Sequence, residues 1–461
     1  MLAGKHILLG VTGSIAAYKI ANLASMLVKQ HAQVTVLMTQ NATNFINPIT
    51  FETLTSNKCL VDTFDRNFQY DVQHVSLAKQ ADLFLVAPAS ANVIGKLANG
   101  IADDMLTTTF MACKCPKLIS PAMNTAMYEN SIVQENLQKL AAHGIEIIEP
   151  AGGRLACGDT GVGKMPEPET LLAWILKYLA HEKDLAGKKV LISAGPTQEA
   201  IDPVRYITNH STGKMGYALA ENCMRRGAQV TLVSGPTAIE QPLFVDVVPV
   251  VSAAEMADAV KSRADEQDII IMTAAVADYR PLYVAKEKIK KEAGAQQMPQ
   301  QMPQQVTQQV TQQNQQQISQ QVMQQTLQGE LTDQNSQEES KAENSEKAGA
   351  DAGLEAGNMS IPLTRTEDIL SYLGAHKKAG QFICGFSMET EHMLENSRSK
   401  LERKNVDMIV ANSLRTEGAG FGTDTNVVTL ITKDSCTELP LMPKAEVAGA
   451  IVDAIILKNR R

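Results

Sequence analysis

The chain contains the same strand, turn and helix pattern twice, and this repetition limits the possible fold more than any other feature. The run KKVLISAGPT at 188–197 echoes KHILLGVTGS at 5–14, and AQVTLVSG at 228–235 echoes AQVTVLMT at 32–39. A tight turn between strand and helix points backbone N–H groups and the positive helix end at a phosphate. We therefore expect two α/β units that each bind a nucleotide-like ligand, although any doubly wound sheet has turns of this kind.

The fold class predicted is α/β, with two Rossmann-like domains: an N-terminal domain built on a parallel sheet with helices on both faces, and a C-terminal α/β domain. The first domain is expected over residues 1–181, followed by a polar linker at 182–188 and a second domain at 189–461. Strands are predicted at 6–11, 33–38, 83–88, 117–123, 145–150, 381–387 and 406–412, and late helices at 367–379 and 392–405. A Gln-rich, low-complexity insertion at 293–357 interrupts the second domain, because it cannot bury enough apolar surface to fold.

Composition excludes several classes of protein. The net charge of -8 lacks the basic balance of a nucleic-acid binder, and no apolar run reaches the roughly 18 residues of a membrane span. Seven cysteines, an odd number, form no disulfide framework and indicate a reducing, cytoplasmic location. Cys113 and Cys115 are too close together for the usual zinc spacing.

The first turn favours a mononucleotide such as FMN over NAD. The stretch GVTGSIAAYK lacks the G-x-G-x-x-G pattern, and the second strand ends in Met38 and Thr39 where a dinucleotide fold usually has an acidic residue. The hydroxyls of Ser14 and Thr39 can hydrogen-bond to a phosphate. A second turn, which contains Ser90 and Asn92, can donate to it as well.

Several long motifs resemble one enzyme family. TGSIAAYK, APASAN, PAMNTAM and ACGDTGVGKM resemble flavin-containing, homo-oligomeric cysteine decarboxylases, and DPVRYITNHSTGKMG with AAVADYR resembles the ligase fused to them. Together they are similar to bacterial bifunctional phosphopantothenoylcysteine decarboxylases/phosphopantothenate–cysteine ligases of coenzyme A synthesis. The resemblance implies small-molecule substrates (4′-phosphopantothenate, cysteine and CTP), FMN and Mg²⁺ as cofactors, and assembly as a homo-oligomer. The FMN-binding residues that it implies are Gly13, Ser14, Ile15, Thr39, Ser90, Ala91, Asn92, Val93 and Ala122.

Decarboxylation needs an electron sink, because an unactivated carboxylate leaves a carbanion behind. The resemblance implies that FMN oxidises the substrate thiol to a thioaldehyde, which accepts the electrons as CO₂ leaves, and that hydride then returns to the enethiol. It further implies that Asn124 binds the carboxylate, His74 is an acid/base and Cys157, on a Gly-rich flap, gives a proton to the enethiol. Without the family, Asn124 is an N-cap of a helix starting at Thr125, and His74 a cap or surface residue. Tyr128 stands where the family usually has Trp.

Ligation requires a leaving group on the carboxylate before an amine can displace it. In the resembling ligases CTP forms an acyl-cytidylate and releases pyrophosphate, with Mg²⁺ neutralising the phosphates. Arg205, Asn209 and Lys288 match the family's catalytic positions. The matching nucleotide positions are Met272, Thr273, Ala274, Asp278, Lys288, Thr366, Glu367, Asp368, Ile369, Phe386, Lys400 and Lys404. RTEDIL at 365–370 replaces the family's Asn-Pro-Asp, and Lys400 with Lys404 alone would indicate one exposed helix face.

Two rival functions remain at this point. A flavoprotein-fold regulatory binding protein is disfavoured by the joint presence of His74, Asn124 and Cys157. Another flavin-dependent enzyme, such as a prenyl transferase of the same fold, would not explain the ligase half.

Overall fold

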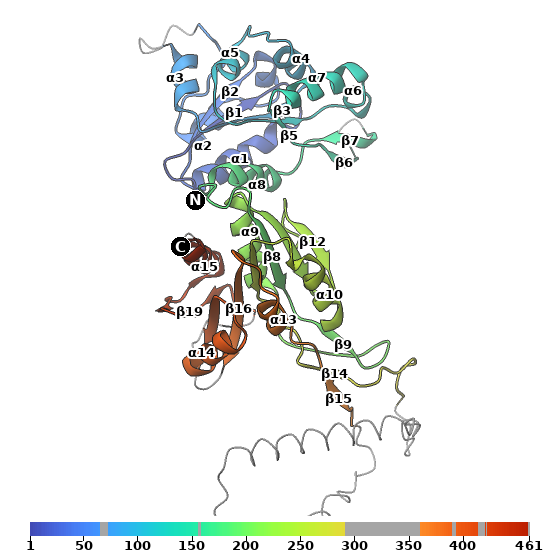
Figure 1. Ribbon diagram of the computed structural model, residues 1–461. Helices are drawn as coiled ribbons and strands as arrows, with labels where there is room; N and C mark the ends of the chain where they lie inside the picture. Colours follow the sequence, from blue (N-terminus) through green and yellow to red (C-terminus); the bar gives the residue numbers. More distant parts are fainter. Residues whose placement is uncertain are drawn as a thin grey trace, which may run out of the picture. The chain divides into compact units, whose positions relative to one another are not determined.

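A computed structural model of the protein describes residues 1–64, 72–154, 158–290, 360–389, 393–413, 420 and 422–459 (Figure 1). The chain divides into two compact units. Unit 1 comprises Met1–Gln198, Thr208–Asp278 and Thr366–Arg461, and unit 2 comprises Glu199–Ile207 and Tyr279–Arg365. The insertion predicted at 293–357 lies outside the described residues.

Unit 1 begins with a five-stranded sheet in the order β2-β1-β3-β4-β5, whose neighbours all run parallel. Its strands are β1 (His6–Val11), β2 (Gln33–Met38), β3 (Leu83–Ala89), β4 (Lys117–Pro121) and β5 (Glu146–Ile147). All residues of β1 and β3 are buried, as expected for a parallel sheet covered on both faces. The predicted bounds of the first two strands are confirmed.

Helices cover both faces of this sheet. One face packs against α1 (Ala17–Lys29), α2 (Pro48–Thr55) and α8 (Pro168–Leu179). The other face packs against α3 (Gln73–Gln80), α4 (Ala91–Ala98), α5 (Met105–Ala112) and α7 (Ser131–Ala142). The remaining elements are η1 (Gln40–Asn44), α6 (Thr125–Tyr128) and an antiparallel hairpin of β6 (Ala151–Arg154) and β7 (Thr160–Lys164).

A second sheet of unit 1 has eight strands in the order β12-β11-β8-β13-β16-β17-β19-β20. These are β8 (Lys189–Ala194), β11 (Gln229–Ser234), β12 (Asp246–Pro249), β13 (Ile269–Met272), β16 (Phe382–Glu389), β17 (Met408–Ser413), β19 (Val428–Thr432) and β20 (Cys436–Glu438). The strands from β12 to β17 are parallel, which confirms the predicted α/β class, whereas β19 and β20 return antiparallel. The sheet is therefore mixed.

Helices again cover both faces. Cores form beneath α9 (Lys214–Arg225) and α15 (Lys444–Asn459) on one face, and beneath α10 (Ala253–Ala264), α13 (Ile369–Ala375) and α14 (Met393–Arg403) on the other. A short antiparallel pair, β18 (Thr425–Asn426) with β21 (Met442–Pro443), precedes α15.

Unit 2 contains β14 (Tyr279–Pro281) and β15 (Leu363–Arg365), which pair antiparallel with Tyr279 opposite Arg365. The short strands β9 (Gln198–Ala200) and β10 (Tyr206–Thr208) form another pair.

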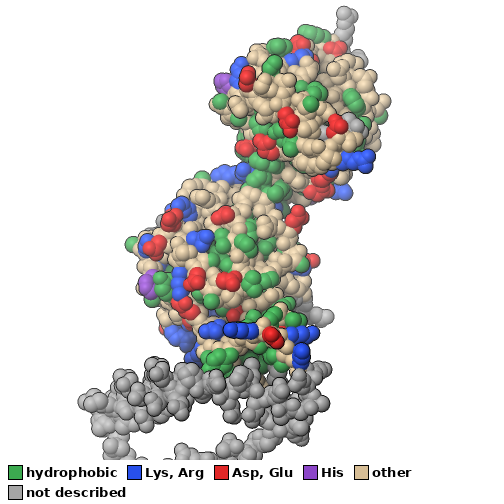
Figure 2. All heavy atoms as spheres, turned by 90° about the vertical axis from the view of Figure 1, so that its right-hand side faces the viewer, with side chains coloured by type: hydrophobic (Ala, Val, Ile, Leu, Met, Phe, Trp, Pro, Cys, Tyr) green, Lys and Arg blue, Asp and Glu red, His purple; other side chains and the backbone are tan. Residues whose placement is uncertain are grey.

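Basic and acidic side chains are interspersed over most of the face seen in Figure 2. In the part of the chain that the structure describes, none of the helices has the length and apolar character that crossing a membrane requires.

Candidate functional site

The predicted flavin-binding residues directly follow four neighbouring strands of the first sheet. Gly13 and Ser14 follow β1, Thr39 follows β2, Ser90 follows β3 and Ala122 follows β4. The carboxyl ends of parallel strands share one edge of the sheet, which is where ligands bind in open α/β folds. The structure therefore brings these residues to one edge, which the order of motifs in the sequence did not by itself require.

The first turn is shaped by close packing and by a hydroxyl that sequence reasoning missed. A Cβ at Gly13 would lie 2.9 Å from Cβ of Asn41, so a side chain is excluded there. The Thr12 hydroxyl donates to the Pro88 carbonyl oxygen (2.7 Å) and accepts from the Ser90 N–H (2.9 Å). Thr12 thus ties the turn after β1 to the turn after β3, and its place inside the GVTGS motif was the only available signal.

The hydroxyls and amides at this edge differ in how they are used. Thr39 is buried, and its Oγ1 has no hydrogen-bond partner among the described residues. Ser90 precedes α4 without capping it through its side chain, and Asn92 is exposed. The Val93 side chain is only 1% exposed and packs in the core, so its backbone N–H is the part that can face a ligand. Ile15, in contrast, is 59% exposed.

Asn124 both caps a helix and presents its amide nitrogen to a carboxylate. Its Oδ1 accepts from the N–H of Ala126 (2.8 Å), and its Nδ2 donates to Oδ2 of Asp159 (3.0 Å). The cap fixes the amide orientation, because the oxygen is occupied by the helix and the NH₂ group must point the other way. The N-cap interpretation and the carboxylate-binding interpretation of Asn124 are therefore compatible.

The β6–β7 hairpin lies against the segment that contains Asn124. The Met123 N–H donates to the Gly163 carbonyl oxygen (3.1 Å), and a Cβ on Gly161 would meet Oγ1 of Thr125 at 2.5 Å. Cys157, predicted on a Gly-rich flap, lies outside the described residues. His74 is the second residue of α3, which agrees with its predicted place at the start of a helix. Its side chain is half-buried.

Tyr128 ends the short helix that Asn124 caps. Its hydroxyl donates to Oε2 of Glu149 (2.8 Å). Burial and this carboxylate raise the pKa of Tyr128 to about 12, so the phenol stays protonated at neutral pH.

Several of the predicted ligase residues of unit 1 lie at the carboxyl end of strand β13 in the second sheet. Met272 ends β13, and the Thr273 hydroxyl and the Ala274 N–H both bind Ser193 at the end of β8 (2.5 and 3.1 Å). Nδ2 of Asn209 donates to the Ala275 carbonyl oxygen (2.5 Å). The loop after β13 and the Asn209 segment are thereby held together.

The stretch that departs from the family pattern joins the same loop. The Thr366 hydroxyl donates to the Ala277 carbonyl oxygen (2.5 Å). The Thr366 N–H donates to the Asp278 carbonyl oxygen (2.9 Å). Glu367 forms an ion pair with Lys261, and Ile369 is buried as the first residue of α13.

Lys400 of α14 and Lys404, which follows this helix, contact this region. Asp368 caps α13 and forms an ion pair with Lys404; burial opposes ionisation of Asp368, but the ammonium group outweighs it and lowers the pKa of the carboxyl. Lys400 donates to the Phe386 carbonyl oxygen (2.9 Å). The structure therefore gathers the predicted nucleotide residues of unit 1 in one region.

Arg205 and Lys288 belong to unit 2. Nη1 of Arg205 binds Oδ2 of Asp202 (2.6 Å) and the Ile289 carbonyl oxygen (3.0 Å), which places Arg205 beside the residue that follows Lys288. Among the described residues, no group of three His, Cys, Asp or Glu side chains could hold a metal ion.

Comparison with known proteins assigns both halves of the chain. Residues 1–180 match the Flavoprotein family model, and residues 185–346 and 339–458 match the DNA/pantothenate metabolism flavoprotein C-terminal domain. A coenzyme A biosynthesis bifunctional protein CoaBC from Bacillus subtilis (strain 168) is 42% identical over 465 residues, covering 100% of this chain and 99% of that protein. The chain belongs to this family of bifunctional proteins.

Other members of the family are also similar to the chain. The CoaBC protein of Vibrio vulnificus (strain YJ016) is 39% identical over 454 residues, covering 98% of each chain. A crystal structure of the C-terminal domain of a coenzyme A biosynthesis bifunctional protein CoaBC is 36% identical, covers 60% of this chain and 98% of that chain, and has a TM-score of 0.40. The resemblance predicted from the motifs is confirmed: this is a bifunctional enzyme of coenzyme A biosynthesis with decarboxylase and ligase activities.

Proposed function

We propose that this coenzyme A biosynthesis bifunctional protein joins cysteine to 4′-phosphopantothenate with CTP, and then decarboxylates the product to 4′-phosphopantetheine with FMN. The observation that supports the proposal is that the predicted flavin residues follow four neighbouring strands at the carboxyl edge of the first sheet, while Met272–Ala274 lie at the carboxyl end of β13 in the second. The two family-model matches fit a division into a decarboxylase domain at 1–181 and a ligase domain at 189–461.

The carboxyl edge of the first sheet has the chemistry that FMN requires. Gly13 keeps the turn after β1 short, the buried Thr39 hydroxyl has an unused hydrogen-bonding capacity, and the first N–H groups of α4 lack intrahelical partners by geometry. A phosphate is stabilised at such a helix start. The cofactor would be held by Gly13–Ile15, Thr39, Ser90–Val93 and Ala122.

When bound, the flavin supplies the electron sink that decarboxylation needs. Asn124 grips the substrate carboxylate through Nδ2, the atom that donates to the Asp159 carboxylate in this structure. A neutral donor suits this role, because a cation would stabilise the carboxylate in the ground state and oppose its loss. His74 moves a proton near the thiol, and Cys157 donates a proton to the product enethiol.

The ligase step uses the edge of the second sheet. Asn209, held by Ala275, and Arg205, held by Asp202, handle the acyl group, while Lys288 neutralises the triphosphate. The nucleotide is bound by Met272–Ala274, Asp278, Thr366–Ile369, Phe386, Lys400 and Lys404. Mg²⁺ enters with CTP, since Mg²⁺ commonly binds through substrate phosphates with few protein ligands. Assembly as a homo-oligomer and a cytoplasmic location remain predictions.

Incubation of the purified protein with 4′-phosphopantothenate, cysteine, CTP and Mg²⁺ tests the proposal. Pyrophosphate, CO₂ and 4′-phosphopantetheine should form, and omission of CTP should abolish all three. Supplying 4′-phospho-N-pantothenoylcysteine directly should restore CO₂ without CTP. A colourless protein that stays inactive after reconstitution with FMN would contradict the decarboxylase half, and absence of pyrophosphate would contradict the ligase half.

A further inference from the structure

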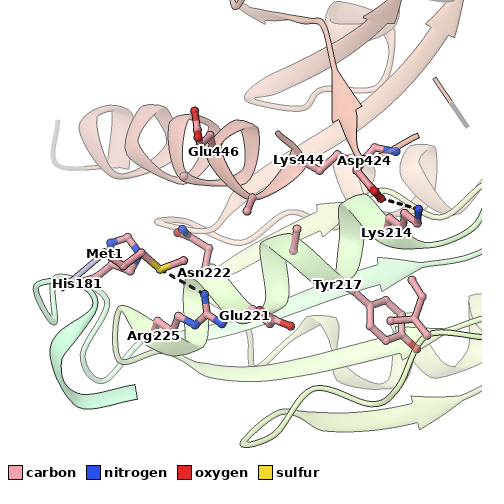
Figure 3. A pocket seen from close by; sticks show the side chains of 14 residues that line it. Met1, His181, Lys214, Tyr217, Glu221, Asn222, Arg225, Asp424, Lys444 and Glu446 are labelled. Atoms are coloured by element: carbon pink, nitrogen blue, oxygen red, sulfur yellow. Dashed lines mark hydrogen bonds and ion pairs between the residues drawn. The ribbon is translucent and has the colours of Figure 1, made fainter. Parts of the chain in front are cut away.

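Two lysines, one on α9 and one on α15, contact Gly420 and the residues 422–424 that precede β19. Nζ of Lys214, the first residue of α9, donates to the Gly422 carbonyl oxygen (2.8 Å) and to Oδ1 of Asp424 (2.7 Å). Figure 3 shows this ion pair at one end of a cavity of about 480 Å³, with Lys444 beside it.

Lys444, the first residue of α15, completes the arrangement. Its Nζ donates to the carbonyl oxygens of Gly420 (3.1 Å) and Thr423 (2.5 Å). Its backbone N–H donates to the Asp424 carbonyl oxygen (2.9 Å). Lys444 is only 8% exposed. Burial, and then the neighbouring Lys214, lower the pKa of the Lys444 ammonium.

Neither lysine is where helix stability alone would put it. The first turn of a helix carries a partial positive charge, so a cation there is unfavourable, and a buried ammonium is costly unless it is well paired. The compensation comes from three backbone carbonyls and one carboxylate of a single segment. Gly420 (φ 122°) and Gly422 (φ 80°) adopt backbone conformations in which a side chain would be strained.

This segment is connected to the proposed acyl site by a short chain of hydrogen bonds. Oδ1 of Asn209 accepts from the Ser211 N–H (3.1 Å), and Oγ of Ser211 accepts from the Gly213 N–H (3.4 Å). Lys214 is the next residue. The conformation of residues 422–424 is therefore linked to the position of Asn209 through the start of α9.

We propose that Lys444, assisted by Lys214, is a positioning residue that serves as a built-in monovalent cation for the ligase half. Its ammonium group fills a carbonyl-lined position of the kind that K⁺ takes in other proteins, and it fixes residues 423 and 424 next to the start of α9. The inference rests on the proposed ligase function.

Lys444→Met tests this role, because methionine keeps most of the side-chain volume and removes the charge. Pyrophosphate release by the full-length variant should fall at least tenfold in N-methylglucamine buffer. Addition of K⁺ or NH₄⁺ at constant ionic strength should raise the rate of pyrophosphate release by Lys444→Met at least threefold, since either ion can replace the ammonium group. Wild type and Lys458→Met, a control on the same helix whose lysine pairs with Asp434, should not respond.

Two further measurements separate a positioning role from a general loss of stability. Decarboxylation of supplied 4′-phospho-N-pantothenoylcysteine by the same Lys444→Met chain should be unchanged. Hydrogen exchange of the 422–426 amides should accelerate in the variant and slow again with K⁺. Should Lys444→Met fail to fold, the half-exposed Lys214→Met variant should show a smaller ligase loss in the same direction.

The inference is overturned if Lys444→Met keeps ligase activity within twofold of wild type, or if K⁺ changes all variants equally. A wild-type protein that releases no pyrophosphate would instead overturn the proposed function. In that case the hydrogen exchange of the segment, with and without K⁺, still decides whether Lys444 acts as an internal cation.

Discussion

Docking of the β6–β7 hairpin on the Asn124 segment can be tested at one glycine. Gly163 has φ 144°, and a Cβ there would lie far inside contact distance of the Met123 carbonyl oxygen. Gly163→Ala should therefore push the hairpin away and break the hydrogen bond from the Met123 N–H to the Gly163 oxygen. Because the clash is with backbone, no side-chain rotation can relieve it.

A matched control exists on the same hairpin. Gly153 has φ 137°, but a Cβ there meets nothing within 4 Å. Both alanine variants bear the backbone strain of about 1–3 kcal/mol that a sparsely populated positive-φ conformation imposes on an L-residue. The difference between Gly163→Ala and Gly153→Ala isolates the lost contact with Met123.

The expected difference follows from the hydrogen bond and the clash. A neutral hydrogen bond contributes about 1 kcal/mol, which corresponds to about a fivefold change in the docked population. The backbone clash adds to this, so kcat/KM for CO₂ release should be about tenfold or more lower in Gly163→Ala than in Gly153→Ala. Ligase activity and flavin absorbance should match in the two proteins. Equal decarboxylation rates, within twofold, would refute the view that this docked hairpin is needed for catalysis.

Three other changes test separate parts of the molecule. Asn124→Asp places a negative charge where a carboxylate must bind, so CO₂ release should fall at least a hundredfold while pyrophosphate release persists; retained CO₂ release would count against the carboxylate role. Gly13→Ala should lower the flavin content at least fivefold, whereas Gly95→Ala, whose Cβ meets only an amide nitrogen at 3.8 Å, should keep it; equal flavin absorbance would place the cofactor elsewhere. Burial raises the pKa of Asp202, but N–H donors and Arg205 outweigh it and lower the pKa to about 2. The carboxylate therefore stabilises its loop above the unfolded pKa of about 3.9, and this stabilisation is lost as pH falls toward 2. Limited proteolysis should show acid opening of the loop in wild type and pH-independent opening in Asp202→Asn; identical profiles would contradict this.

The positions of the strands were predictable where the apolar runs are buried on both faces. HILLGV and QVTVLM form β1 and β2 with the predicted bounds, since continuous β-rich apolar runs fit a covered parallel sheet. The antiparallel return through β19 and β20 was not predicted. The apolar run of β19 does not indicate strand direction, and CTE in β20 is exposed throughout and has no apolar pattern.

Site residues were predictable where a motif carries them, but their partners were not. Asn124 stood out in PAMNTAM, whereas its contact with Asp159 depends on how the hairpin docks. The contacts of Lys214 and Lys444 with Asp424 join residues far apart in the chain, and one sequence contains no local signal for such pairs.

The pairing of β14 with β15 has a practical consequence for engineering. The chain leaves this ladder after Leu282 and returns at Pro362, and the Leu282 N–H donates to the Pro362 oxygen (2.9 Å). Because the departure and return points are fastened together, the intervening length can change with little effect on strand register. A fluorescent reporter inserted beyond Lys290, so that Lys288 and the Ile289 contact with Arg205 are kept, should leave both sheets intact.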